Sequence, residues 1–168
     1  MVERIDYGLQ NRVQGFESPP RLKMETEKLE QDLIKVVGAV IFNEKRDAVL
    51  VGQRAQNTNY PLKYEFPGGK IEEGESPERA IAREIKEELG LEVEPQQILY
   101  VGFEDLENLG KATHQIFYIE CRVKSDFQDT KLDSESHKII EWVEIGKLVQ
   151  LDLFEADLEF AKKLISSS

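Results

Sequence analysis

The sequence is short of cysteine, of long apolar runs and of positive charge, and each shortage excludes a class of protein. The single cysteine among 168 residues, Cys121, excludes an internal disulfide framework and a zinc site built from several cysteines. The longest apolar run, residues 36–42, is far shorter than the roughly 20 residues of a membrane-spanning helix, so no membrane partner is expected. With 22 basic and 33 acidic residues the net charge is −11, and because this field repels phosphate, no nucleic-acid polymer is expected as a partner.

The length of the chain fits one domain preceded by an extension. Residues 1–33 have no sustained hydrophobic period, contain Pro19 and Pro20 and end in a mostly charged stretch. They are expected to form a weakly ordered arm or a short helix, with the domain over residues 34–168. No basic segment followed by an apolar one marks a secretory signal, so a cytoplasmic protein is expected. Whether the protein is a monomer or a homodimer stays open.

Strand and helix patterns alternate without a strict repeat, which predicts a mixed α+β fold. Two apolar runs, residues 34–42 and 48–54, flank a polar turn and are expected to pair as a hairpin. Cys121 and Trp142 lie in later apolar runs, so both are expected to be buried. A final helix is expected from apolar residues at helical spacing, and these are Leu158, Ala161, Leu164 and Ile165. Further strands are expected over residues 98–103, 115–123 and 139–143.

The clearest local signal is a helix expected from Pro77 to Leu89. Ser76 is a good N-cap, proline suits the first helical position, and Gly90 stands where a left-handed C-terminal residue is wanted. Three glutamates of this helix, at positions 84, 87 and 88, lie within an arc of about 100° and share one face. They repel one another and stand near the helix C-terminus, where the macrodipole also disfavours anions.

This acidic face has two readings. Clustered glutamates usually form a solvated surface, but carboxylates that share a face also suit hard cations such as Mg²⁺ or Mn²⁺. The loop before the helix favours the second reading. Pro67 and two glycines allow a tight backbone turn that could aim a carbonyl at the same ion, and Lys70 offers a point charge to phosphate.

At this point a family resemblance is carried by nine defined positions spread over 23 residues. In order they are Gly69, five residues, Glu75, seven residues, Arg83-Glu84-Ile85, one residue, Glu87-Glu88, one residue, and Gly90-Leu91. This pattern resembles the complete Nudix box. The resemblance implies a Nudix-type α/β/α sandwich with a mixed sheet. It also implies Mg²⁺- or Mn²⁺-dependent cleavage of a nucleoside diphosphate linked to another group.

The same resemblance implies roles for individual residues. Glu84, Glu87 and Glu88 would be the catalytic metal ligands, with the carbonyl of Gly69 as a further ligand. Arg83 would orient the glutamates by charge-assisted hydrogen bonds. Glu75 would brace the junction of loop and helix. Outside the box, Glu135 is either a candidate for an extra ligand or base or an exposed acid of its loop. Which glutamate accepts the proton stays open.

Residues outside the box point to a branch of the family. The segments around Arg54 and Phe66 are similar to the MutT-like branch, in which the matching residues help to hold a nucleotide. Asp157 matches a segment that places an amide or acid against the base edge, where a buried polar group can reject the wrong base. His114 matches a histidine near the nucleotide. Lys70 completes the expected substrate-binding set.

The resemblance to this branch implies hydrolysis of a nucleoside triphosphate to the monophosphate and pyrophosphate, with an oxidised purine such as 8-oxo-dGTP as first choice. CTP or dCTP is the close alternative. An ADP-ribose or dinucleoside pyrophosphatase is a more distant one, because the usual signatures after the box are missing. A nucleotide sensor without catalysis is disfavoured because the box is intact.

Overall fold

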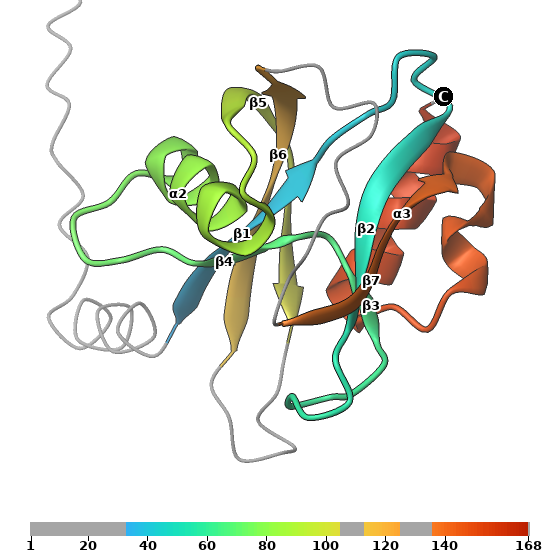
Figure 1. Ribbon diagram of the computed structural model, residues 1–168, viewed down its shortest axis with the longest axis horizontal. Coiled ribbons are helices and arrows are strands. Elements are labelled where there is room, and N and C mark those ends of the chain that lie inside the picture. Colours follow the sequence, from blue (N-terminus) through green and yellow to red (C-terminus); the bar gives the residue numbers. More distant parts are fainter. Residues whose placement is uncertain (1–32, 105–112, 125–135, 168) are drawn as a thin grey trace, which may run out of the picture. The chain divides into compact units, whose positions relative to one another are not determined.

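The computed structural model describes residues 33–104, 113–124 and 136–167 (Figure 1). The arm expected over residues 1–33 lies outside this part of the chain except for Leu33, and Glu135 lies outside it too. In chain order the elements are β1 (Ile34–Val40), β2 (Ala48–Arg54), β3 (Tyr64–Glu65), β4 (Gly68–Lys70), α2 (Pro77–Leu89), β5 (Val93–Glu104), β6 (His114–Val123), β7 (His137–Glu144), the 3₁₀ helix η2 (Ile145–Gln150) and α3 (Glu155–Ser166).

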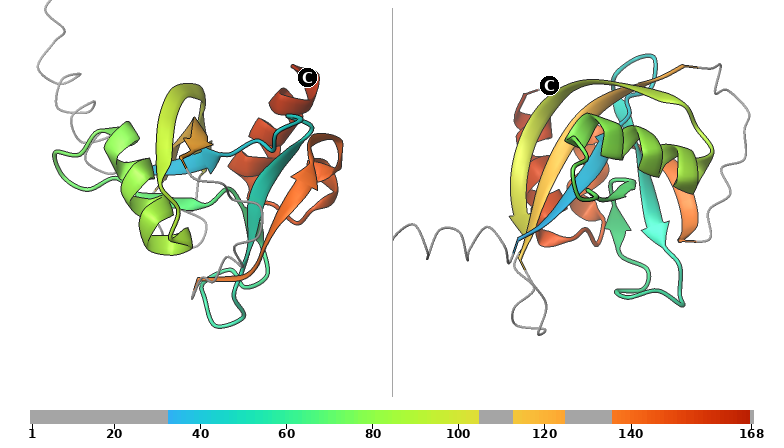
Figure 2. Two further views of the ribbon diagram at one scale, coloured as in Figure 1. Left: turned by 45° about the horizontal axis from the view of Figure 1, so that its top comes forward. Right: turned by 90° about the vertical axis from the view of Figure 1, so that its left-hand side faces the viewer.

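The strands form two sheets. The larger has the order β4-β1-β6-β5, in which β1 runs parallel to β6 and antiparallel to β4, and β5 runs antiparallel to β6. The smaller sheet, β3-β2-β7, is antiparallel throughout. Figure 2 shows α2 and α3 on opposite sides of β1 and β6. The expected α+β sandwich with a mixed sheet is confirmed.

Side chains of β1 alternate between two core clusters, one packed against each helix. Val37 and Ala39 are 3% and 0% exposed and belong to the cluster that contains Ile85 of α2. Val40 points to the other face, where it joins a second cluster with Phe160 of α3. Because successive side chains of a strand point to opposite faces, one apolar strand supports both layers. The site described below is built on this strand and on α2.

Helix α2 has the bounds that its capping residues predict. The Ser76 hydroxyl accepts a hydrogen bond from the backbone N–H of Arg79 at 3.4 Å, which satisfies one of the first-turn donors. Gly90 ends the helix with a φ of +68°, in the left-handed region that glycine tolerates, and its N–H donates to the carbonyl of Lys86. Local chemistry therefore determines both ends of the helix.

The expected hairpin of residues 34–42 and 48–54 is wrong beyond its turn. Phe42 and Val49 do form an antiparallel bridge, and the N–H of Leu50 donates to the carbonyl of Ile41. Past this point the chain leaves one sheet for the other, so β1 and β2 belong to different sheets. Both strands are apolar and buried, and each finds more partners in separate sheets than a two-stranded hairpin would provide.

Other strand boundaries differ from the expected ones. Strand β5 begins at Val93, five residues before the expected start, and its pairing is irregular between Pro95 and Gln97. Proline cannot donate to a ladder, so the extra length pairs across a bulge. Three short elements, β3, β4 and the helix η2, were not expected, because each has too few residues to show a hydrophobic period.

The expected final helix is α3, and its apolar face packs as predicted. Phe160 and Ala161 are buried, and Leu158, Leu164 and Ile165 are partly buried against the same cluster. Within the described part of the chain, no helix has both the length and the apolar character needed to cross a membrane.

Two expectations for buried strand residues have different outcomes. Cys121 is buried at 4% exposure, and burial raises the pKa of its thiol to about 12, so the thiol stays protonated and inert. The expectation of a buried Trp142 is wrong, because its side chain is 40% exposed. Val143, the next residue of β7, points inward, so the pleat turns Trp142 outward.

Replacing Gly68 tests how closely β4 packs on β1. A Cβ at this position would lie 1.9 Å from the carbonyl oxygen of Val37, a backbone atom that cannot move away easily. We expect Gly68→Ala to lower the free energy of unfolding, measured in urea titrations, by about 1–3 kcal/mol or more. Gly146→Ala is the control, since no atom lies within 4 Å of its added Cβ. Equal stability of the two variants would contradict the close packing.

Candidate active site

The guanidinium of Arg83 on α2 donates hydrogen bonds to both the loop and the helix that carry the expected site. It donates two hydrogen bonds to Glu75, from Nε at 3.1 Å and from Nη2 at 2.9 Å. Nη2 also donates to the backbone carbonyl of Lys70 at 2.9 Å, and Nη1 donates to Glu84 at 2.8 Å and Glu87 at 3.3 Å. Arg83 therefore fastens the loop between β4 and α2 to the helix.

These ion pairs shift the titration of both partners. Hydrogen bonds from Arg83, with a further one from the backbone of Glu72, lower the pKa of Glu75. Hydrogen bonds to Glu75 and Glu84 raise the pKa of Arg83. Both groups stay charged at neutral pH, so the brace expected of Glu75 is present as an ion pair.

The Glu84 carboxylate lies directly against the backbone of Gly69. A Cβ built on Gly69 would come 2.4 Å from Cδ of Glu84, so any side chain at position 69 would displace the carboxylate. The side chain of Glu84 is only 16% exposed. A glycine is therefore required where strand β4 meets helix α2.

Glu88 has both carboxylate oxygens occupied by donors. Oε2 accepts the backbone N–H of Gly68 at 3.3 Å, and Oε1 accepts the hydroxyl of Ser136 at 3.2 Å. Burial raises the pKa of Glu88, and a nearby charge on His137 opposes that shift. The orientation of the Glu88 carboxylate is thus fixed from two sides.

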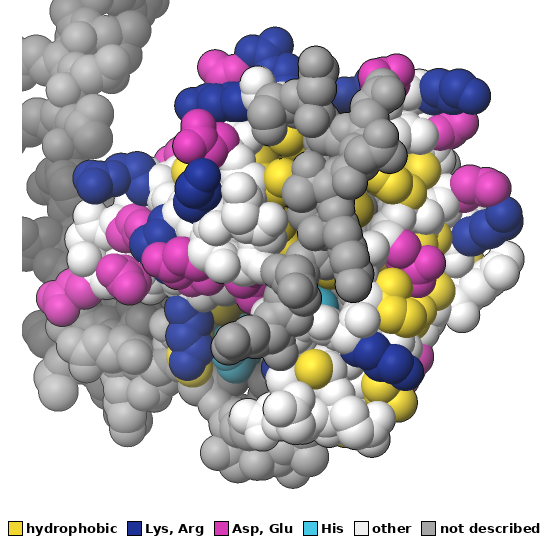
Figure 3. Space-filling view, in the orientation of Figure 1, with side chains coloured by type: hydrophobic (Ala, Val, Ile, Leu, Met, Phe, Trp, Pro, Cys, Tyr) yellow, Lys and Arg dark blue, Asp and Glu magenta, His cyan; other side chains and the backbone are white. Residues whose placement is uncertain are grey.

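The residues present fit a hard divalent cation. Glu84, Glu87 and Glu88 come from one face of α2, and the glycine at position 69 leaves its backbone open to them. Figure 3 shows acidic side chains gathered along α2 and the loop before it. Over the described ranges no three acidic, histidine or cysteine side chains converge closely enough to hold an ion as they stand. Glu84 and Glu87 instead turn to Arg83, so binding an ion would require them to rotate.

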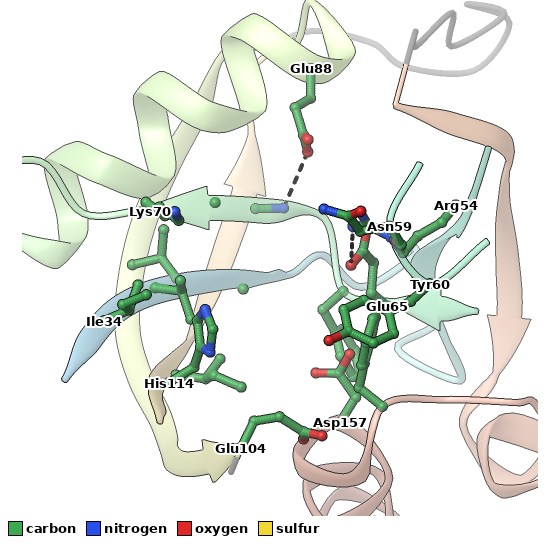
Figure 4. A pocket seen from close by; sticks show the side chains of 18 residues that line it. Ile34, Arg54, Asn59, Tyr60, Glu65, Lys70, Glu88, Glu104, His114 and Asp157 are labelled. Atoms are coloured by element: carbon green, nitrogen blue, oxygen red, sulfur yellow. Dashed lines mark hydrogen bonds and ion pairs between the residues drawn. The ribbon is translucent and has the colours of Figure 1, made fainter. Parts of the chain in front are cut away.

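A cavity of about 640 Å³ opens beside this loop (Figure 4). All five residues expected to bind substrate line it, and these are Arg54, Phe66, Lys70, His114 and Asp157. Of the expected metal ligands, Gly69 and Glu88 line the cavity, but Glu84 and Glu87 do not. The sequence therefore identified residues that the fold brings to one cavity from strands β2, β4 and β6, from the link between β3 and β4, and from helix α3.

Arg54 is held against the wall of this cavity by two partners. Its Nη1 donates to both carboxylate oxygens of Glu65, at 2.9 and 3.0 Å. Its Nε donates to the carbonyl of Asn59 at 2.8 Å, within the loop between β2 and β3. Arg54 is therefore a fixed cation whose charge is balanced by Glu65.

Asp157 is a buried acid in the first turn of α3, with 6% exposure. The Tyr118 hydroxyl donates to its Oδ1 at 2.6 Å. Burial raises the pKa of Asp157 to about 8, and the negative charges of Glu65 and Glu104 add to this effect. Glu104 also caps α3, since its Oε2 accepts the N–H of Ala156 at 2.6 Å. At neutral pH Asp157 is mostly a neutral carboxylic acid.

Phe66 and His114 form part of the cavity wall in different ways. Phe66 is 5% exposed and packs edge-on against Tyr118 and Phe160, with ring centroids 5.7 and 5.3 Å apart. Its role here is to support the cavity from within the aromatic core. His114 lies at the start of β6 and lines the cavity near Ile34.

Several residues of the cavity and its surroundings were missed from the sequence. They are Asn59, Tyr60, Glu65, Glu104 and Tyr118, with His137 behind Glu65. None belongs to a spaced motif, because these residues come from several elements and loops. The only available signal was that Glu65 directly precedes Phe66 in the segment that resembles the MutT-like branch.

Comparison with known proteins agrees with this architecture. The NUDIX domain family matches residues 32–164. The chain is 32% identical over 126 residues to a CTP pyrophosphohydrolase of Escherichia coli, covering 75% of this chain and 87% of the relative. An 8-oxo-dGTP diphosphatase of E. coli is 40% identical over 74 residues, which is 44% of this chain and 54% of that protein. The crystal structure of a MutT protein from Methanosarcina mazei superposes with a TM-score of 0.69 at 26% identity, covering 80% of this chain and 94% of that one.

The fold, the complete nine-position motif and the family match over most of the chain lead to one conclusion: this chain belongs to the Nudix family and is a Nudix hydrolase.

Proposed function

We propose that this chain hydrolyses a nucleoside triphosphate to the monophosphate and pyrophosphate, with Mg²⁺ or Mn²⁺ as the cofactor. The observation that carries the proposal is the cavity that has Lys70 and Glu88 on one side and Asp157 on the other (Figure 4). Cationic and carboxylate groups on the first side suit phosphates with their ions. The buried polar group on the other side suits the edge of a base.

Each group of the site has a chemical task in this reaction. Bound ions would neutralise phosphate oxygens and lower the pKa of an attacking water. Glu84, Glu87 and Glu88, with the Gly69 carbonyl, would hold these ions. Arg83 holds two of these carboxylates, those of Glu84 and Glu87, beside the loop until they rotate toward an ion. The balance of charge then favours a phosphate chain beside Lys70 and Arg54.

Asp157 supports an oxidised purine as the first choice of base. A neutral carboxylic acid offers one donor and one acceptor side by side. Guanine presents two acceptors, N7 and O6, on its major-groove edge. The 8-oxo form carries a proton on N7 and so presents one donor and one acceptor, which match Asp157. Ordinary guanine would leave one of these groups unsatisfied, at a cost in binding.

CTP or dCTP is the second candidate, and one specific observation favours it. The E. coli relative that matches over most of its own length is named a CTP pyrophosphohydrolase. Cytosine presents an amino donor next to a ring acceptor, so its edge is also complementary to a neutral Asp157.

Replacing Glu87 by glutamine tests the metal face of α2. The side chain of Glu87 is 60% exposed, so Glu87→Gln should fold normally while losing one ligand charge. We expect pyrophosphate release in saturating Mg²⁺ to slow by at least about 100-fold, the scale on which active-site electrostatic groups act. Glu78→Gln, an exposed glutamate of the same helix outside the nine motif positions, is the matched control. Unchanged turnover in Glu87→Gln would rule out this mechanism.

A substrate panel decides which base is preferred. Initial rates should be measured with 8-oxo-dGTP, dGTP, CTP, dCTP and ADP-ribose, in Mg²⁺ and in Mn²⁺, with pyrophosphate and phosphate assayed separately. We expect the highest kcat/KM with 8-oxo-dGTP and release of pyrophosphate, because Asp157 pairs with the oxidised edge. A maximum with ADP-ribose would show that the assignment to triphosphates is wrong, and no product from any substrate would indicate a sensor.

The raised pKa of Asp157 predicts a specific pH dependence of stability. Between the ordinary pKa of about 3.9 and the folded value of about 8, the folded protein keeps a proton that the unfolded chain has released. Stability therefore falls as pH rises through this window, by up to about 1.4 kcal/mol per pH unit from this group. Asp157→Asn should remove this component when unfolding free energies are measured from pH 5 to pH 9. An identical pH profile in the variant would mean that Asp157 titrates normally.

A further inference from the structure

His137 is a buried histidine that the activity proposed above leaves without a role. Its side chain is 1% exposed, at the start of β7. Nε2 lies 3.0 Å from Oε1 of Glu65, and because a carboxylate only accepts, Nε2 donates in this pair. Nδ1 lies 3.2 Å from Oγ of Ser136, whose hydroxyl donates to Glu88 at 3.2 Å. The ring thus lies between two carboxylates that come from different elements.

These contacts form one continuous hydrogen-bonded chain across the site. It begins at Arg54, passes through Glu65, His137 and Ser136, and ends at Glu88, which also accepts the N–H of Gly68. Figure 4 shows the two ends of this series of hydrogen bonds, which are the Arg54–Glu65 pair and Glu88 above β4. The chain links the smaller sheet, which bears Arg54, to helix α2, which bears the acidic face.

Strand β2 leaves room for the His137 imidazole by having a glycine beside it, which lowers the stability of the strand. A Cβ on Gly52 of β2 would lie 2.3 Å from Cδ2 of His137 and 2.7 Å from its Nε2. Glycine within a strand interior weakens the strand, by roughly 0.5–1 kcal/mol relative to alanine. A buried imidazole also loses hydration, which its hydrogen bonds must replace. An apolar side chain of the same size would also need Gly52 but would lose no hydration, so filling alone does not account for the histidine.

We propose that His137, acting through Ser136, is a positioning residue that orients the carboxylate of Glu88 for a divalent cation. It also links Glu88 through hydrogen bonds to Arg54 in the wall of the cavity. The proposal rests on the proposed function only in taking Glu88 as a metal ligand. A glutamate on a helix has several rotamers, and each one that is excluded before an ion binds lowers the entropy cost of binding. The Ser136 hydroxyl and the Gly68 N–H hold one oxygen each, so both oxygens are oriented.

Direct measurement of Mn²⁺ binding tests the proposal on the full-length chain without nucleotide. Isothermal titration calorimetry would be performed on wild type, Ser136→Ala, His137→Phe and Gly52→Ala. We expect each variant to bind Mn²⁺ about 10- to 100-fold more weakly, the usual effect of removing a partner of a metal ligand. Gly52→Ala is informative because it displaces the His137 ring while keeping every side chain of the hydrogen-bonded series. Tyr64→Phe is the control, since it removes a hydroxyl bound to Glu141 and should leave Mn²⁺ affinity unchanged.

A conservative replacement separates positioning from a merely structural role. His137→Gln keeps an amide that can donate to Glu65, so it should bind Mn²⁺ more tightly than His137→Phe at equal thermal stability. In turnover assays of the His137 variants, kcat should fall and the Mg²⁺ concentration for half-maximal rate should rise, with KM for the nucleotide changed less.

The possible results have distinct meanings. Mn²⁺ affinity within twofold of wild type in both Ser136→Ala and Gly52→Ala would overturn the proposal, even if His137→Phe failed to fold. It would also be overturned if Glu88→Gln bound Mn²⁺ normally, or if the wild type bound no Mn²⁺. If no triphosphate were hydrolysed but Ser136→Ala still weakened Mn²⁺ binding, the proposed function would fail and the positioning role would stand.

Discussion

The guanidinium of Arg83 joins the loop after β4 to the helix that carries the acidic face, and the geometry of the site depends on this contact. It binds Glu75 and the carbonyl of Lys70 on the loop side, and Glu84 and Glu87 on the helix side. Pairing with one cation offsets the repulsion between carboxylates on one helix face, which costs a few tenths of a kcal/mol for each pair. The backbone of Gly69 then lies directly against the Glu84 carboxylate.

The overall charge of −11 first seems to conflict with a phosphate-bearing substrate. Residues 69–91 contribute seven acids against four bases, so the acidity is concentrated where phosphates are proposed to bind. The two cations that line the cavity do not reverse this charge, because Arg54 is already balanced by Glu65. Divalent ions would reverse it locally. The acidic composition thus becomes an argument for strict dependence on a divalent ion.

Sequence reasoning succeeded where the determining chemistry is local and failed where it is not. Ser76 and Gly90 fixed the bounds of α2, because a cap acts within one helical turn. The pairing of β1 with β2 was wrong beyond the turn, since strand partners are chosen by distant segments. Trp142 was expected inside because its neighbours are apolar, but the pleat of β7 turns it outward. Glu65 and His137 are 72 positions apart, and only the folded chain brings them into contact.

The central claim is that α2 and the loop before it form the ion-binding centre of this hydrolase. Anomalous diffraction at the manganese edge, from crystals grown with Mn²⁺ and a slowly hydrolysed nucleotide analogue, tests it most directly. We expect anomalous peaks coordinated by Glu84, Glu87 and Glu88 and by the carbonyl of Gly69, with Arg83 still bound to Glu75. Peaks confined to the other side of the cavity, beside Asp157 and Glu104, or no ordered Mn²⁺ at α2, would contradict it.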